Sequence, residues 1–154
     1  MRKRPGNLLV LLLCLSLVSL HGAAQTTQRR LLLVCGVDSP IPSLSHTEVR
    51  KLFLGEPVEK DGLRLKPLRN ASDPQLTEVF LQKIIFMSKR HYERQLVSRV
   101  FRLGGVRPKI YTRIPELADE LRKSPQTVTY MWSSQLEQAE GVKSIGVLWE
   151  GLAY

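Results

Sequence analysis

The amino-acid sequence predicts an α/β domain built on a largely parallel or mixed sheet, with helices on both faces. The first reason is a continuous apolar run, LLLVCGV over 31–37, which has the length of a strand. A strand without polar alternation is typical of one that is covered on both faces. The second reason is that predicted strands and amphipathic helices alternate along the rest of the chain, which favours helical crossovers over a sheet.

The first 24 residues precede this domain and have the organisation of a secretory signal peptide. Three basic residues at positions 2–4 come before an apolar run over 8–20, and small residues follow that run. The apolar run is shorter than the roughly 20 residues that a membrane-spanning helix needs, so we expect a cleaved leader rather than a membrane span. The small residues place the expected cleavage after Ala24. Lipid attachment at Cys14 is the weaker alternative, since Leu13 stands where a small residue is required.

The predicted export of the chain limits which partners its net positive charge could attract. The chain carries a formal net charge of +9, and three of its 23 basic residues but none of its 14 acidic residues lie in the predicted signal peptide. The remaining segment, 25–154, has the length of a single domain and a net charge of about +6. Basic composition usually indicates nucleic acid, but for an exported protein we expect a small anion, anionic lipid or an acidic protein surface instead. An ordinary solvated surface explains the charge equally well.

One cysteine, Cys35, remains after cleavage, so no disulfide can form within the chain. This excludes a small disulfide-stapled extracellular scaffold and is typical of a bacterial periplasmic domain that relies on its core. We expect Cys35 to be a buried small hydrophobe. A nucleophilic role needs a neighbouring base, and neither His46 nor His91 lies in a catalytic motif.

A helix is predicted from 46 to about 54, after a loop rich in proline and serine. Ser45 and Glu48 have the spacing of a capping box, in which each side chain hydrogen bonds to the other residue's backbone. Gly55 then fits the left-handed conformation that commonly ends a helix.

A short edge strand is predicted next, over 63–68, where apolar and basic residues alternate until a proline interrupts the ladder. The most regular helix follows it. Ser72 and Gln75 are predicted to form a second capping box, with Asp73 and Pro74 in the first helical turn, where an acid and a proline are both favoured.

The rest of the chain predicts two more helices and two more strands. The helices lie over 89–102 and from Pro115 to about 123, with Pro115 as the first residue of the second helix. The strands lie over 127–131 and 144–149, and they complete the alternation on which the fold class rests.

In this order, the segments resemble the phosphate-binding family of periplasmic solute-binding proteins. The most specific match is EVRKLFLG over 48–55 with Asp61-Gly62 downstream, and the resemblance extends from Leu31 to about Leu148. It implies a type 2 periplasmic-binding-protein fold, related to phosphate ABC transporter substrate-binding proteins. Full-length members have two lobes that enclose the ligand, whereas 25–154 has the length of one lobe. We therefore expect a short single-lobe member.

The resemblance also implies a phosphate loop between Arg69 and Phe80. In the family, this loop carries an arginine and a Ser-Gly-Thr triplet that bind phosphate at a helix N-terminus. Aligned without gaps from Phe80, these four positions fall on Asn70, Pro74, Gln75 and Leu76. None of the family's four residues is retained, and Pro74 also removes one amide donor.

Displaced donors remain in the loop and form the candidate ligand-binding set. Its members are Arg69, Asn70, Ser72 and Thr77. They would bind phosphate or another small anion weakly or together with a partner. Ser72 is explained at least as well by helix capping, so both interpretations stay open.

Two functions from different classes follow from these observations. The first is a periplasmic solute-binding-like protein for a small anion. The second is a ligand-free interaction or regulatory module that docks on a periplasmic sensor or transporter, because the absent second lobe leaves a face uncovered. A homodimer across that face would combine the two.

The sequence contains no HExxH, GxSxG or Walker motif, so we predict no enzymatic activity, catalytic residue, metal ligand or cofactor.

Overall fold

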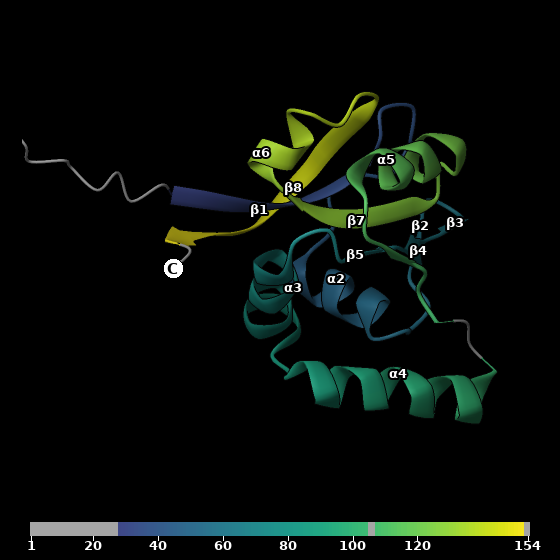
Figure 1. The fold of residues 1–154 in the computed structure, drawn as a ribbon. Helices are drawn as coiled ribbons and strands as arrows, with labels where there is room; N and C mark the ends of the chain where they lie inside the picture. The colour runs from purple at the N-terminus through teal and green to yellow at the C-terminus, as the bar shows by residue number, and fades with distance from the viewer. Residues whose placement is uncertain (1–27, 105–106, 153–154) are drawn as a thin grey trace, which may run out of the picture.

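The structure, a computed structural model, describes residues 28–104 and 107–152 (Figure 1). The predicted signal peptide, its cleavage after Ala24 and Cys14 lie outside the described residues. Within the described ranges, none of the helices combines the length and the apolar character needed to cross a bilayer.

Four strands form the main sheet, in the order β4, β7, β1, β8. The central strand β1 (Gln28–Gly36) runs antiparallel to β7 (Thr127–Trp132) and to β8 (Val142–Leu152). Strand β4 (Lys66–Pro67) runs parallel to β7. The sheet is therefore mixed, the second of the two arrangements that the sequence allowed.

Helices and short strands complete the domain. The helices are α2 (His46–Phe53), α3 (Pro74–Phe80), α4 (Lys89–Leu103), α5 (Ile114–Lys123) and the short α6 (Ser133–Leu136). A stretch of π-helix, η1 (Leu81–Ile85), continues α3 directly. The short strands are β2 (Glu59–Lys60) paired with β3 (Leu63–Arg64), and β5 (Arg69–Asn70) paired in parallel with β6 (Ile110–Tyr111).

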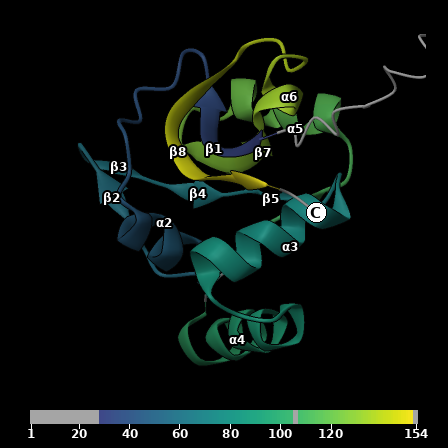
Figure 2. The same cartoon turned by 90° about the vertical axis from the view of Figure 1, so that its left-hand side faces the viewer.

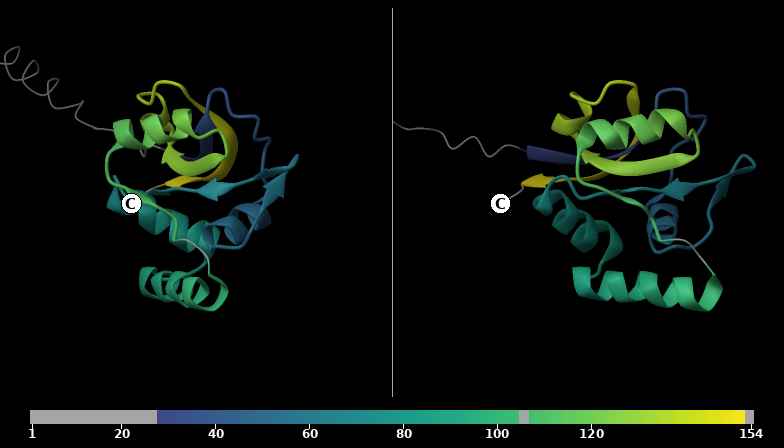
Figure 3. Two further views of the ribbon diagram at one scale, coloured as in Figure 1. Left: turned by 90° about the vertical axis from the view of Figure 1, so that its right-hand side faces the viewer. Right: turned by 45° about the vertical axis from the view of Figure 1, so that its right-hand side comes forward.

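The helices cover both faces of the sheet, as predicted. Helices α5 and α6 lie on one face, α2 and α3 lie on the other, and α4 forms an additional layer outside α2 and α3 (Figures 1 and 2). The view from the opposite side shows the same layers (Figure 3). Strand β1 explains this arrangement, because Leu31 and Leu33 belong to one buried cluster and Leu32 and Val34 to the other. Successive side chains of a strand point to opposite faces.

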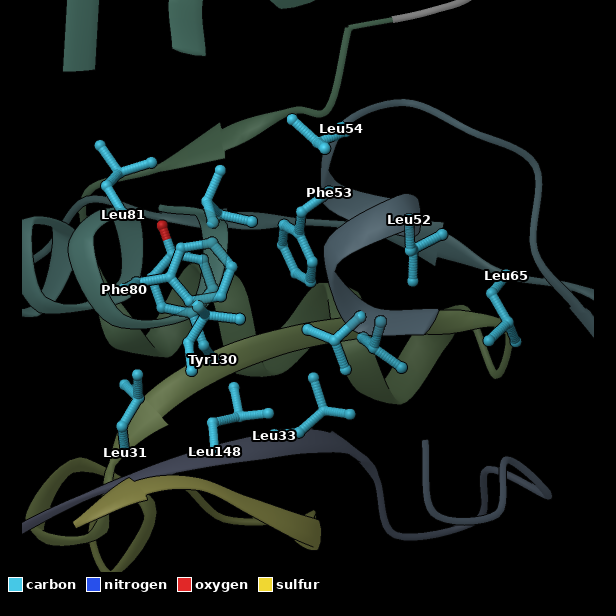
Figure 4. Close-up of a cluster of buried hydrophobic side chains, with 14 of the residues drawn as sticks. Leu31, Leu33, Leu52, Phe53, Leu54, Leu65, Phe80, Leu81, Tyr130 and Leu148 are labelled. Carbon is cyan, nitrogen blue, oxygen red and sulfur yellow. The ribbon is translucent and has the colours of Figure 1, made fainter. Parts of the chain in front are cut away.

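Three aromatic rings lie at the centre of the larger cluster (Figure 4). The rings of Phe80 and Tyr130 stack with centroids 3.7 Å apart, and Phe53 meets both rings edge-on. All three side chains are almost fully buried. This packing ties α2 and α3 to strand β7.

The capping box that begins α2 is present as predicted. The Ser45 hydroxyl accepts from the Glu48 amide, and the Glu48 carboxylate accepts from the Ser45 amide. The ammonium group of Lys60 lies 2.6 Å from the same carboxylate, and together with the Ser45 contacts it lowers the pKa of Glu48 to about 2. Gly55 has φ +82°, which confirms the left-handed residue expected after this helix.

The expected strand over 63–68 is divided into β3 and β4, with Leu65 buried between them. The division has a local cause, because the backbone changes partner at this point. The Leu65 amide donates to the carbonyl of Val58, whereas the Lys66 amide donates to the carbonyl of Gln126. One half of the segment thus belongs to a hairpin and the other half to the main sheet.

Cys35 is fully buried in the larger cluster, which confirms the expected structural position. Burial raises the pKa of its thiol. Its polar neighbours are Ser39 and Lys143, while the His46 ring meets the carbonyl of Leu148 at 2.9 Å. A buried and protonated thiol is not a nucleophile.

Candidate functional site

The loop between β5 and α3 is the segment in which a phosphate site was expected. Helix α3 begins at Pro74, and its N-cap is Asp73 rather than Ser72. Asp73 Oδ1 accepts hydrogen bonds from the amides of Gln75 and Leu76, at 2.7 and 3.3 Å. The predicted Ser72 capping box is therefore wrong. The physical reason is that a proline in the first helical position makes the residue before it the N-cap.

The second carboxylate oxygen of Asp73 is also engaged. Its Oδ2 accepts from the indole Nε1 of Trp132 at 3.0 Å, which fastens the loop to the end of β7. The guanidinium of Arg29 lies over the Trp132 ring, 5.4 Å from its centroid. The first amide donors of α3 therefore already hold a negative group, supplied by the chain itself.

Asn70 lies inside the protein rather than in a ligand-binding position, with no exposed surface. Its Nδ2 donates to the carbonyl of Tyr130 at 3.0 Å. Its Oδ1 accepts from the amide and the hydroxyl of Ser72, at 3.0 and 2.6 Å. The Ser72 hydroxyl in turn accepts from Gln135 Nε2 at 3.1 Å. These bonds join the loop to β7 and α6.

Thr77 faces the preceding turn of the chain. Its hydroxyl lies 3.3 Å from the carbonyl oxygens of both Asn70 and Asp73, to which it donates. A hydroxyl carries one proton, so both contacts share the same donor. The hydroxyl proton of Thr77, which would be needed to hydrogen bond to an anion, is thus directed to backbone carbonyl oxygens.

Arg69 is the remaining candidate, and its side chain is 8% exposed. Its Nη2 forms an ion pair with Glu93 of α4, and the same carboxylate pairs with Arg107. The guanidinium lies over the ring of Tyr92, with Cζ 5.1 Å from the centroid. Within the described ranges, Arg69 Nη1 is buried and has no hydrogen-bond partner.

The charges around Arg69 set the protonation states of its neighbours. Burial by itself would raise the pKa of Glu93, but the hydrogen bond from Arg69 and the charges of Arg69 and Arg107 outweigh it, and the pKa is lowered. Burial raises the pKa of Tyr92 to about 12. Glu93 is therefore ionised and Tyr92 neutral at physiological pH, so Arg69 faces one carboxylate and an aromatic ring.

A hollow of about 620 Å³ opens next to this ion pair, between α3, η1 and the start of α4. Its apolar lining consists of Ala71, Pro74, Leu81, Met87 and Ile110, and its polar lining of Arg69, Thr77, Glu78, Gln82, Ser88, Lys89 and Glu93. The four predicted site residues thus separate into two pairs. Arg69 and Thr77 reach the hollow, whereas Asn70 and Ser72 hold the loop to the sheet.

The sequence interpretation missed three residues that determine this site: Asp73 as the cap, and Glu93 and Arg107 as the partners of the arginine network. Proline at position 74 is a signal that could have identified Asp73. No local signal identifies Glu93, because it lies 24 residues from Arg69 in the chain. Among the described residues, no group of three or more histidine, cysteine, aspartate or glutamate side chains is arranged to hold a metal.

Replacing Asp73 by alanine is expected to lower the free energy of unfolding by about 1 kcal/mol, because the amides of Gln75 and Leu76 lose their acceptor. Urea-induced unfolding followed by circular dichroism measures this change. Asp73→Asn is the matched control, since the amide oxygen of asparagine can still accept from both amides. An alanine variant as stable as the wild type would contradict the capping role.

Two solved structures share the fold of this chain. One is a crystal structure of an ABC-type phosphate transport receptor from Vibrio cholerae, with a TM-score of 0.54 and 11% sequence identity over 78% of this chain. The other is a crystal structure of PstS from Borrelia burgdorferi, with a TM-score of 0.53 and 11% identity over 77% of this chain. No family model and no curated protein sequence matches the chain.

These similarities confirm the expected fold class, a mixed α/β domain with a mixed sheet and helices on both faces. The chain spans 46% and 47% of the two receptor chains, about half of their length. At 11% identity, the likeness concerns the fold alone.

Proposed function

We propose that this chain is a single-lobe, binding-protein-like module that acts through its surface and does not capture phosphate. The observation that carries the proposal is the position of Asp73. Its carboxylate accepts from the first amide donors of α3 and from Trp132, where the resemblance places the phosphate. A second anion at this place would be repelled by a like charge and would find those donors occupied.

The neighbouring side chains support the same proposal. Asn70 and Ser72 donate to and accept from groups within the protein, and Thr77 donates to backbone carbonyls. Moving one of these donors to a ligand would leave a buried acceptor without a partner, which costs about 1–3 kcal/mol for each group. Such a loop favours the helix-capped state over the phosphate-bound state.

The place of action in this proposal is the bacterial periplasm. Support comes from the leader-like first 24 residues and from the single remaining cysteine. The mass of the protein purified from an expressing bacterium tests it. A chain that begins at Gln25 and is released with the periplasmic fraction is expected, whereas an intact Met1 terminus would contradict export.

The functional experiment is an isothermal titration of the chain from Gln25 onward with phosphate at low salt. Low ionic strength is chosen because it favours any electrostatic binding. We expect no binding heat at millimolar phosphate from a protein whose folding is verified by circular dichroism. Saturable binding in the micromolar range would overturn the proposal and identify the lobe as a phosphate receptor.

A second candidate function, weak binding of a small anion, is favoured by one observation. Arg69 Nη1 is buried without a partner among the described residues, and Arg69 lines the hollow beside α3. The opposing observation is that Glu78 and Glu93 line the same hollow. A titration with a carboxylate such as succinate tests this candidate. Binding that is retained by Asp73→Asn and lost in Arg69→Met would support it.

The proposal contains no catalytic step. One of the solved structures that share the fold is that of a phosphate transport receptor. This fits the prediction from the missing catalytic motifs, which remains a prediction.

A further inference from the structure

Helix α4 presents one face to the body of the protein and the opposite face to solvent. Tyr92 and Leu96 form its buried face, and the Tyr92 hydroxyl donates to the carbonyl of Phe53 at 2.8 Å. In Figures 1 and 2, α4 is the outermost layer on this side of the molecule. Its outer face thus points away from the sheet and from α2 and α3.

Four residues form a continuous stripe along this outer face: Arg90, Arg94, Val97 and Phe101. Their spacing of four, three and four residues places them on one side of a helix, opposite Tyr92 and Leu96. All four side chains are exposed. We call this set the outer stripe of α4.

The apolar half of the outer stripe is unusual for a solvated surface. Phe101 is 85% exposed, more than any other large hydrophobic residue in the described ranges, and Val97 is 37% exposed. Leu103, beyond the end of the stripe, is 69% exposed. Transfer of apolar surface from water is favourable by about 25 cal/mol per Å², so a partner that covers Phe101 gains stability.

The basic residues of α4 indicate that this partner is negatively charged. Within its sequence, α4 carries five basic residues and one acidic residue, Glu93. Glu93 is held by Arg69 and Arg107. The exposed basic side chains are Lys89, Arg90, Arg94 and Arg102, and none of them pairs with an acidic group of the described chain. The outer face of α4 therefore carries a net positive charge and would attract a negatively charged partner.

We propose that the outer stripe of α4 docks this lobe on the surface of an anionic phospholipid bilayer, with Phe101 entering the headgroup region. This inference rests on the proposed function, since it names the partner of a module that acts through its surface. A basic amphipathic helix with an aromatic residue on its apolar part is typical of helices that lie in a membrane interface. The long arginine side chains cover apolar surface while their charged groups reach the phosphates.

The shape of the surface favours lipid over a folded acidic protein. The stripe lies on a single projecting helix, so a rigid partner would need a matching concave groove, whereas a lipid surface adapts to a convex helix. The segment from Gln25 onward carries a net charge of about +6, which attracts the whole molecule to an anionic surface before any specific contact forms. Arginine contacts then orient α4 parallel to that surface.

Co-sedimentation of the chain from Gln25 onward with vesicles tests the proposal. One set of vesicles contains phosphatidylglycerol and phosphatidylcholine, and the other contains phosphatidylcholine alone. We expect binding to the anionic vesicles at low salt, little binding to the neutral vesicles, and loss of binding at about 0.5 M salt, where charges are screened.

Two sets of variants locate the contact on the stripe. Arg90→Ser combined with Arg94→Ser is expected to weaken binding at least about tenfold. The matched control combines Lys51→Ser with Arg64→Ser, which removes two exposed positive charges that do not belong to α4 and is expected to change binding much less. Phe101→Ser on its own is also expected to weaken binding to anionic vesicles, whereas Phe101→Trp is expected to retain it.

Several results would overturn the proposal. These are no binding of the wild type to anionic vesicles, equal binding to neutral vesicles, or equal losses from the stripe variant and its control. A dimer in sedimentation velocity that Phe101→Ser dissolves, without vesicle binding, would assign the stripe to a second copy of the chain. Binding to soluble polyglutamate but not to vesicles would assign it to an acidic protein. The phosphate titration is independent of these outcomes, so failure of the lipid partner and failure of the proposed function are distinguishable.

Discussion

Replacing Asn70 by alanine is expected to lower the free energy of unfolding by about 3 kcal/mol. The side chain has no exposed surface, donates to the carbonyl of Tyr130 and accepts from the amide and hydroxyl of Ser72. Alanine would leave this buried carbonyl and the Ser72 donors without their partners, at about 1–3 kcal/mol for each unsatisfied group. Urea-induced unfolding at neutral pH measures the loss.

This variant separates a structural asparagine from a ligand-binding one. A residue that only contacts a ligand can be truncated with little effect on the stability of the free protein. Thr77→Val is a useful comparison, because it removes a hydroxyl that lies only partly buried and makes longer bonds of 3.3 Å. A loss below about 1 kcal/mol in Asn70→Ala would contradict the structural role.

The second large effect is expected from Glu93→Gln, which removes the charge that faces the buried guanidinium of Arg69. Removing the charged partner of the buried guanidinium is expected to cost about 2–3 kcal/mol, less than for a fully buried pair, because the Glu93 side chain is 30% exposed and water screens part of the charge. Glu93 also pairs with Arg107, which is more exposed and contributes less. Thermal or urea-induced unfolding at pH 7 measures the loss.

Arg69→Met combined with Glu93→Gln is the control for this interpretation. With the buried cation gone, glutamine leaves no uncompensated charge, and the double variant is expected to be more stable than Glu93→Gln alone. Additive losses in the two single variants and the double variant would contradict the pairing.

The same ion pair gives a pH dependence whose sign is fixed. The pKa of Glu93 is lower in the folded protein than its ordinary value of 4.5, so its stabilising contribution is complete above that value. The contribution is lost as the pH falls below 4.5 and the carboxylate takes up a proton. In Glu93→Gln this part of the acid destabilisation is expected to be absent.

The sequence predicted those parts of the fold that depend on local patterns. The capping box of Ser45 and Glu48 set the start of α2, and the periodicity and Gly104 set the extent of α4. The apolar run over 31–37 identified the central strand. Each of these signals lies within a few residues of the feature that it specifies, so chain topology was not needed.

The sequence did not predict the strand directions or the partners of the candidate site. Strand β1 pairs antiparallel with both of its neighbours, and these pairings join residues about 100 positions apart. The pairing of Arg69 with Glu93 requires α4 to fold back beside β5, which no local pattern encodes. The error at Ser72 was different in kind, because two adjacent residues could both cap the helix and the proline decided between them.

The central claim, that Asp73 occupies the donors of α3, is tested most directly by nuclear magnetic resonance of the backbone amides during a phosphate titration. The amide resonances of Gln75 and Leu76 report on their own hydrogen bonds. They are expected to remain in place up to millimolar phosphate in the wild type. Shifts of these two resonances that saturate at micromolar phosphate would show that an external anion displaces Asp73, and would contradict the proposed function.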